Sequence, residues 1–134
     1  LTHFYAQYAS IKPWIRTQSP APAKERLQSP QDRKQLDGYY ECILCACCTA
    51  SCPVTYENEK YLGPASLVQA FRYIFDSRDQ ETPARLKQLN DPDGAWGCRN
   101  HFECTRVCPK EIPVTRSINQ IKREIEKAFK KTDH

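Results

Sequence analysis

The chain has 134 residues, 40% of them hydrophobic and 27% charged, which allows one domain with a modest core. Its formal net charge is +4, and basic and acidic residues are interleaved in the segment 122–131. That mixture is typical of a solvated helix face and excludes the one-sign basic stripe of a nucleic-acid-binding protein. The apolar stretch 67–75 is interrupted by Gln69 and Arg72 and is far shorter than the roughly 20 residues of a membrane-spanning helix. Any membrane contact is therefore expected to be peripheral.

The first predicted element is an extended strap followed by a short helix. The segment from Lys12 to Pro30 contains four prolines, and proline holds a chain open because it supplies no amide donor. Residues 31–37 are then predicted to form a short helix that Gly38 ends. The chain begins with Leu1 rather than methionine and without a signal peptide, so we expect residues upstream of it.

The first of two cysteine windows follows, with the spacing C-x2-C-x2-C-x3-C-P. Its members are Cys42, Cys45, Cys48, Cys52 and Pro53. This spacing is typical of bacterial two-cluster ferredoxins, in which three cysteines hold one iron-sulfur cluster and the fourth ligates the other. The proline ends the local turn and directs the fourth thiolate away. The eight cysteines of the chain are crowded into two windows, which argues against a disulfide scaffold.

Two helices are predicted between the windows. Gly63-Pro64 begins the first, because proline suits the first helical position. Its apolar side chains recur at helical spacing, and they are Leu67, Ala70, Phe71, Ile74 and Phe75. Thr82-Pro83 provides the N-cap and first turn of the second helix, which is predicted to end at Leu89.

The second cysteine window has the spacing C-x5-C-x3-C-P, which is the first pattern with its middle cysteine replaced by His101. Its members are Cys98, Cys104, Cys108 and Pro109. Exchange of the last ligands between the windows assigns Cys42, Cys45, Cys48 and Cys108 to a 4Fe-4S cluster. It assigns Cys52, Cys98 and Cys104 to a second cluster that lacks a fourth thiolate. Such a cluster commonly persists as 3Fe-4S.

The last predicted helix follows Pro113 and places Ile118, Ile121, Ile125 and Phe129 on one side. No segment alternates as a strand. We therefore predict an all-α fold, an alpha-helical ferredoxin-like domain with two iron-sulfur cluster loops related as a pseudo-repeat. In this scheme residues 1–37 form the N-terminal strap and short helix, and residues 38–134 form the domain that binds both clusters.

Some residues allow more than one interpretation. Zinc sites usually show two C-x2-C pairs or mixed Cys and His ligands at tetrahedral spacing. Three cysteines in a row at two-residue gaps, followed by C-P, do not match that pattern, so zinc is disfavoured. Cys47 is predicted to be a small buried packing residue rather than a ligand. His101 either shields the second cluster and faces the electron acceptor, or ligates iron where the missing cysteine would stand, as imidazole does in Rieske centres.

These windows and their flanking motifs closely resemble the iron-sulfur subunit of succinate dehydrogenase, respiratory complex II. The matching stretches are Glu41-Cys-Ile-Leu-Cys-Ala-Cys-Cys-Thr-Ala-Ser-Cys-Pro53, Tyr61-Leu-Gly-Pro-Ala65, Phe71-Arg-Tyr73, Asp76-Ser-Arg-Asp79 and Cys104-Thr-Arg-Val-Cys-Pro-Lys110. The opening Thr2-His-Phe-Tyr-Ala-Gln-Tyr8 and Lys12-Pro-Trp14 also resemble the segment that enters the C-terminal domain of that subunit. The resemblance covers almost the whole chain.

The resemblance implies a subunit that passes electrons from a flavoprotein and a 2Fe-2S cluster, through a 4Fe-4S and a 3Fe-4S cluster, to ubiquinone. It also implies membrane anchor subunits, with ubiquinone bound at the interface with them. The implied location is peripheral, on the matrix face of the mitochondrial inner membrane or, alternatively, the cytoplasmic face of a bacterial membrane. Pro53 and Lys122 match quinone-side positions of the family, and Arg99 and His101 are further candidates there.

Three features depart from the family pattern. The plant-type C-x4-C-x2-C run of the 2Fe-2S domain is absent, so that domain is cut away or lies on a separate chain, as in euglenozoan protists. Glu57 stands where the family commonly has a tryptophan that hydrogen-bonds quinone. Around Cys98 the family often has histidine directly after the cysteine and isoleucine at the position of His101.

Other functions remain open from the sequence. A fumarate reductase subunit would run the same chemistry backwards with the same cluster ligands. A freestanding soluble two-cluster ferredoxin would not need the proline-rich strap or the basic last helix. A structural assembly module with vestigial clusters conflicts with the retention of seven thiolates.

Overall fold

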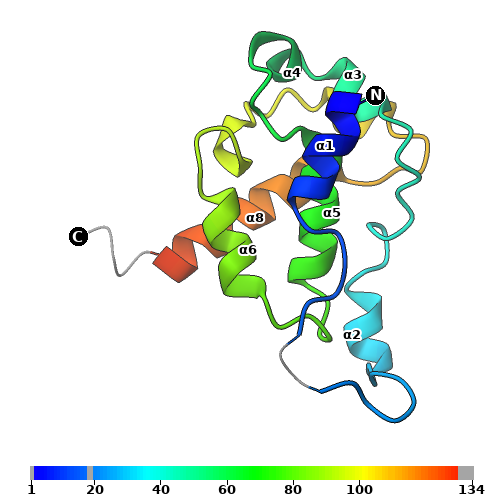
Figure 1. Cartoon of the computed structure of the whole chain (residues 1–134). Helices are drawn as coiled ribbons and strands as arrows, with labels where there is room; N and C mark the ends of the chain where they lie inside the picture. The colour runs from blue at the N-terminus through cyan, green and yellow to red at the C-terminus, as the bar shows by residue number, and fades with distance from the viewer. Residues whose placement is uncertain (1, 18–19, 130–134) are drawn as a thin grey trace.

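The computed structural model describes residues 2–17 and 20–129, and within these ranges the chain is helical and contains no strand (Figure 1). The helices are α1 (Thr2–Ser10), α2 (Pro30–Lys34), α3 (Cys47–Ser51), α4 (Pro53–Glu57), α5 (Pro64–Ile74), α6 (Thr82–Leu89), the 3-10 helix η1 (Ala95–Gly97), α7 (Glu103–Val107) and α8 (Val114–Phe129). The predicted all-α fold class is confirmed. Leu1, residues 18–19 of the predicted strap and residues 130–131 of the predicted charged face lie outside the described residues.

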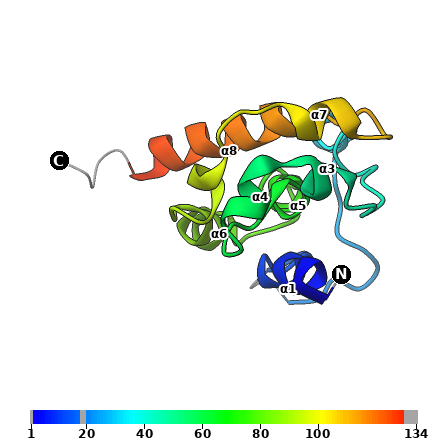
Figure 2. The ribbon, with the colours of Figure 1, turned by 90° about the horizontal axis from the view of Figure 1, so that it is seen from above.

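Helices α5 and α8 form the centre of the molecule and pack against each other and against α6. Figure 2 shows α7 and α8 along one side, α1 along the opposite side, and α4, α5 and α6 between them. The apolar face of α8 is fully buried, with Ile118 and Ile121 at 0% exposure. Burying an aliphatic side chain of this size contributes about 1.5–3 kcal/mol, so this contact is a main source of stability. No helix of the described residues is long and apolar enough to cross a membrane.

The starts of the central helices agree with the prediction. Gly63 adopts a φ of 91°, which a residue with a side chain rarely adopts, and Pro64 opens α5 directly after it. The predicted helix at 31–37 is shorter in the structure and runs over Pro30–Lys34. It begins earlier because the Ser29 hydroxyl accepts a hydrogen bond from the backbone N–H of Asp32 at 3.1 Å.

The N-terminal segment contains a helix that the sequence did not indicate. Helix α1 buries none of its residues, so its sequence has no periodic apolar face to reveal it. It is held by polar contacts, since the Gln7 amide donates to the carbonyl oxygens of Glu59 and Tyr61 at 3.2 and 3.3 Å. The division of the chain at residue 37 stays a prediction, although Ile11 lies in the main apolar core.

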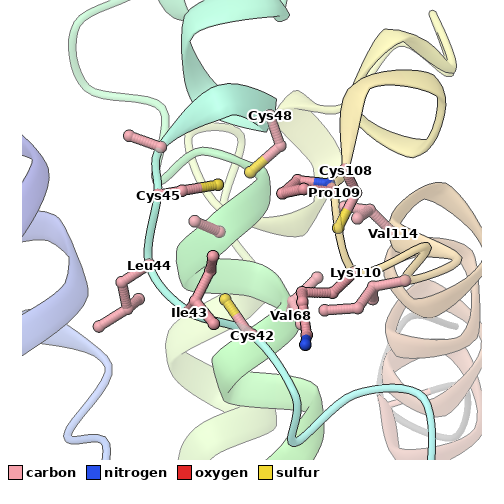
Figure 3. Close-up of a pocket in the computed structure, with 13 residues that line it drawn as sticks. Cys42, Ile43, Leu44, Cys45, Cys48, Val68, Cys108, Pro109, Lys110 and Val114 are labelled. Carbon is pink, nitrogen blue, oxygen red and sulfur yellow. The ribbon is translucent and has the colours of Figure 1, made fainter.

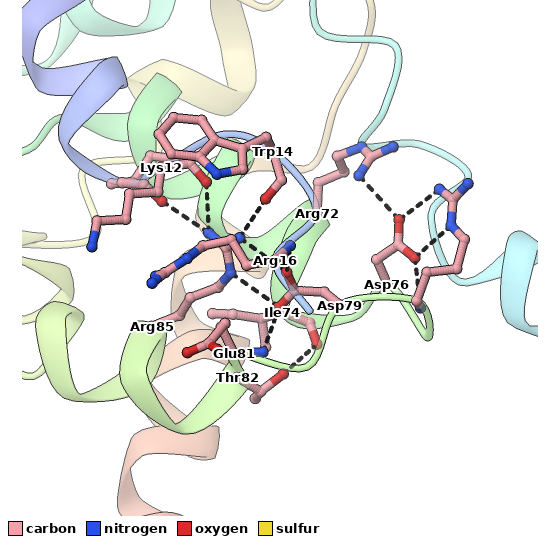
Figure 4. Close-up of polar contacts among 12 residues, drawn as sticks. Lys12, Trp14, Arg16, Arg72, Ile74, Asp76, Asp79, Glu81, Thr82 and Arg85 are labelled. Carbon is pink, nitrogen blue, oxygen red and sulfur yellow. Dashed lines mark hydrogen bonds and ion pairs between the residues drawn. The ribbon is translucent and has the colours of Figure 1, made fainter. Parts of the chain in front are cut away.

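A buried ion pair fastens the segment after α1 to the rest of the fold (Figure 4). The Arg85 guanidinium, 3% exposed, donates to both carboxylate oxygens of Asp79 at 3.0 and 3.1 Å. It also donates to the carbonyl oxygens of Ile11, Lys12 and Trp14 at 2.9, 2.9 and 2.7 Å. One planar cation of α6 thus satisfies five acceptors, and the strap is held further by the backbone N–H of Arg16, which donates to Asp79 at 2.8 Å.

A second ion-pair group lies close by, around the buried side chain of Asp76. Arg78 and Arg72 donate to its carboxylate at 2.8 and 3.1 Å. Burial works to raise the pKa of Asp76, but these cations and hydrogen bonds outweigh it and hold the pKa below its ordinary value. The carboxylate therefore stays charged at physiological pH, and it accepts a hydrogen bond from the strap residue Gln28 at 3.1 Å.

We expect Gly97→Ala to destabilise the fold, because a Cβ at this position would lie 2.5 Å from Cδ1 of Tyr61. The Tyr61 ring is only 3% exposed and cannot swing away. Overpacking of this kind costs about 1–3 kcal/mol of the free energy of unfolding. Thermal unfolding followed by circular dichroism measures the loss. The control is the same substitution in a Tyr61→Leu background, where the smaller side chain leaves room for the added Cβ. An equal loss from Gly97→Ala in both backgrounds would contradict the Tyr61 clash.

Candidate metal-cluster sites

One pocket gathers four cysteines from both windows (Figure 3). They are Cys42, Cys45, Cys48 and Cys108. The pocket has a volume of about 390 Å³, part of it open to solvent. Its wall is mostly apolar, formed by Ala65 and Val68 of α5, Ile112, and Val114 at the start of α8, and it also includes Lys110. The structure therefore brings together the four thiols that ligand exchange assigns to the first cluster.

A second pocket gathers the other three predicted ligands. It encloses about 280 Å³ and is lined by Cys52, Cys98 and Cys104, with Arg99 and His101 also on its wall. Cys52 and Cys104 are buried, and the Cys104 thiol lies 3.3 Å from the Thr115 hydroxyl. The first pocket thus contains Cys108 from the second window, and the second pocket contains Cys52 from the first window.

The two windows repeat the same backbone geometry. Leu44 and Ala46 adopt φ values of 55° and 65°, and Asn100 and Phe102 adopt 58° and 64°. These positions lie two and four residues after the first cysteine of each window, and a five-residue helix, α3 or α7, follows in both. Helices α3 and α7 pack against each other. The structure therefore contains the internal repeat that the cysteine spacing indicates.

The left-handed residues carry a conformational cost. A residue with a side chain pays about 1–2 kcal/mol for this backbone conformation. Strain of this kind persists where the surroundings determine the backbone, and it gathers at functional sites. Four such residues in two ten-residue loops mark both loops as such sites.

Burial affects the protonation of the cysteine thiols in both pockets. Burial raises the pKa of Cys48 to about 12, and burial also raises the pKa of Cys52. These thiols therefore stay protonated at neutral pH unless a metal takes the place of the proton. Among the described residues, no three or more His, Cys, Asp or Glu side chains are placed to hold a single metal ion. An iron-sulfur cluster instead presents a separate iron to each thiolate, so a pocket lined by four cysteines fits it.

The quinone-side candidates lie in different places. Arg99 and His101 are exposed on the wall of the second pocket. Lys122 on α8 donates its Nζ to the Cys98 carbonyl oxygen at 3.1 Å, which brings a positive charge beside that pocket. Pro53 opens α4 directly after Cys52, and Glu57 is exposed at the end of the same helix.

One prediction about the cysteines is wrong. Cys47 is exposed rather than buried, because α3 begins at this residue after the left-handed turn at Ala46 and the turn leaves Cys47 outside the pocket. Sequence reasoning also missed Trp96, whose ring centroid lies 5.9 Å from Nζ of Lys122. The sequence signal that could have pointed to Trp96 is its position two residues before Cys98.

Two neighbouring cysteine pockets on a helical scaffold define a two-cluster iron-sulfur protein. Residues 38–112 match the family model described as "4Fe-4S dicluster domain", and the chain belongs to this family. The match confirms the prediction of a 4Fe-4S protein.

Similar curated proteins carry related names. The chain is 54% identical over 127 residues to "Succinate dehydrogenase [ubiquinone] iron-sulfur subunit, mitochondrial" of Candida glabrata, covering 93% of this chain and 50% of that protein. It is 46% identical over 126 residues to "Succinate dehydrogenase iron-sulfur subunit" of Coxiella burnetii, covering 93% and 54%. A protein of the same name from Paracoccus denitrificans is 49% identical over 123 residues, covering 91% and 48%. The chain spans about half the length of the curated relatives it matches.

Proposed function

We propose that this chain transfers electrons between two iron-sulfur clusters as part of a succinate:quinone oxidoreductase. The observation that carries the proposal is the pair of neighbouring cysteine pockets, each completed by a cysteine from the other window. The names of the relatives support the assignment to this complex. Residues 38–134 are the cluster-binding unit in this proposal, and residues 1–37 fasten it to neighbouring parts of the assembly.

The chain's own part in the reaction is to hold the clusters and to keep water from them. In the first pocket Cys42, Cys45, Cys48 and Cys108 hold a 4Fe-4S cluster. In the second, Cys52, Cys98 and Cys104 hold the core of a 3Fe-4S cluster. When bound, the clusters supply one-electron redox chemistry. The wall of the first pocket is mostly apolar and carries Lys110 as its ionisable side chain besides the thiols, and we assign this pocket electron transfer alone.

Electrons leave through the second pocket in this proposal, because its wall carries the exposed Arg99 and His101. Ubiquinone would bind beside this face, at an interface with membrane anchor subunits. Pro53 and Lys122 are proposed to border the same quinone site. Electrons enter from a flavoprotein subunit through a 2Fe-2S domain or chain. The complex would lie peripherally on the matrix face of the mitochondrial inner membrane.

Purification of the tagged chain from membranes of its source tests this function. We expect it to copurify with a flavoprotein, and we expect succinate to reduce both clusters and added ubiquinone. The reduced clusters are followed by EPR at low temperature. Recovery of the chain as a small free protein whose clusters succinate does not reduce would overturn the proposal.

We expect Lys122→Gln to lower the reduction potential of the second cluster. The ammonium group hydrogen-bonds the carbonyl of the proposed ligand Cys98, and a nearby positive charge favours the reduced, more negative cluster. Potentiometric titration followed by EPR measures the change.

Lys127→Gln is the matched control for this prediction, because it removes the same charge from a side chain of α8 that is 73% exposed. Its effect should be small, since water and salt screen an exposed charge. An equal shift in both variants would indicate a general charge effect and would contradict the local role of Lys122.

A further inference from the structure

The second pocket contains one cysteine fewer than the first. The internal repeat identifies the residue that occupies the position of the missing cysteine. Cys45 lies three residues after Cys42, between the left-handed residues Leu44 and Ala46. His101 lies three residues after Cys98, between the left-handed residues Asn100 and Phe102. Because the residues on either side have matching φ values, we expect the Cβ atoms of Cys45 and His101 to point in equivalent directions relative to their pockets.

Both side chains also have the same environment. Cys45 is exposed at the edge of the first pocket and forms part of its wall. His101 is likewise exposed and forms part of the wall of the second pocket, together with three cysteines. An imidazole is longer than a thiol, and His101 lines the same pocket as the three cysteines.

Three other polar side chains on the wall of the second pocket, apart from Tyr61, are unsuitable as ligands. Arg99 is a permanent cation and has no lone pair to donate. The carboxylate of Glu103 is already bound by the guanidinium of Arg106. The Thr115 hydroxyl is engaged by the Thr105 hydroxyl at 2.9 Å. In contrast, the ring of His101 has no hydrogen bond or ion pair within the described part of the chain.

We propose that His101 is the ligand of a fourth iron in the second pocket, so that the three-iron core held by Cys52, Cys98 and Cys104 converts to 4Fe-4S. The inference rests on the proposed function, which places a cluster in this pocket. In this step one electron reduces the oxidised core, and the reduced core then binds one Fe(II) through three of its sulfides. The ring nitrogen of His101 that carries no hydrogen donates the fourth bond, and the other ring nitrogen keeps its hydrogen. The Fe(II) ion releases water ligands as these four bonds form, and dithionite supplies the electron.

The imidazole also has a consequence for the redox properties. It replaces a thiolate and carries no charge, so the cluster has one negative charge less than a cluster with four cysteines. Imidazole ligation raises the potential in Rieske centres for this reason. A His101→Cys variant should therefore keep four irons in the second pocket but at a lower reduction potential than the wild type.

The test uses the complex as isolated anaerobically, treated with dithionite and Fe(II). In the wild type we expect the EPR signal of the oxidised three-iron core to be lost on conversion. Histidine labelled with 15N should change the nitrogen couplings of the reduced four-iron cluster. Changing a residue that hydrogen-bonds a metal ligand lowers metal affinity by roughly 10–100-fold. Loss of the ligand itself in His101→Ala should raise the Fe(II) concentration for half conversion by at least that factor. His3→Ala is the control, because it removes an exposed histidine that lines neither cysteine pocket, and it should convert as the wild type does.

Two results would overturn the inference and leave the proposed function intact. One is a three-iron core that succinate reduces but that binds no Fe(II), and the other is equal conversion in the wild type and His101→Ala. A second pocket that holds no cluster in the wild type would overturn both the inference and the proposed function.

Discussion

Replacing Cys108 with alanine is expected to change the first cluster and not the second, although Cys108 belongs to the second cysteine window. The first pocket would then keep only Cys42, Cys45 and Cys48, which hold at most a three-iron core. The 4Fe-4S signal of this pocket should be lost almost completely. The reciprocal change, Cys52→Ala, leaves two cysteines in the second pocket and should empty it. Iron content together with EPR of the oxidised and reduced protein distinguishes the two losses.

The physical reason is that each pocket is closed by a thiol from the opposite window. Cys52 and Cys108 each follow a five-residue helix and precede a proline, and α3 and α7 pack side by side. Cys47→Ala is the matched control, because this thiol is exposed and does not belong to the pocket wall. It should retain both clusters. Loss of the second cluster in Cys108→Ala, with the first intact, would contradict the exchange.

Replacing Arg85 with methionine should have the largest effect on stability of any single change outside the cysteines. The substitution keeps much of the side-chain volume but leaves the Asp79 carboxylate buried without its cation. Breaking a buried ion pair by removing one partner costs about 3–5 kcal/mol. In a chain of this size the melting temperature should fall by roughly 10 °C or more. Trypsin should also cleave more rapidly after Arg16, because the strap loses its fastening.

Two further variants isolate the cause. Arg33→Met breaks an ion pair whose side chains are 44% and 59% exposed, and it should leave the melting temperature unchanged. In Arg85→Met with Asp79→Leu the unpaired charge is absent, so part of the stability should return. Recovery should be incomplete, because the carbonyls of Ile11 and Trp14 still lose their donor. Unaltered proteolysis in Arg85→Met would argue against the fastening role.

Much of the helical framework could be predicted because the signals are local. Proline at the first turn and apolar residues at helical spacing determine α5, and the predicted start at Gly63-Pro64 is observed. Helix α6 ends at the predicted Leu89, but its N-cap is Glu81 rather than Thr82, whose hydroxyl donates to the carbonyl oxygen of Ile74 at 3.3 Å. In contrast, α1 could not be predicted, because what holds it are hydrogen bonds to residues more than fifty positions away.

The cysteine sites divide in the same way. Spacing within a window is a property of about ten consecutive residues, so the two windows and the place of the missing cysteine follow from the sequence. Exposure depends on how a loop turns. The left-handed Ala46 leaves Cys47 outside the first pocket, and residue type alone had indicated burial.

The sequence by itself determined which cysteines form each window, where the prolines begin helices, and which residues form the apolar faces of α5 and α8. These properties depend on neighbours within one or two helical turns. Only the tertiary structure decided that α3 and α7 lie together and that Arg85 fastens the strap. Such relations depend on contacts between segments far apart in the chain, and no local pattern records them.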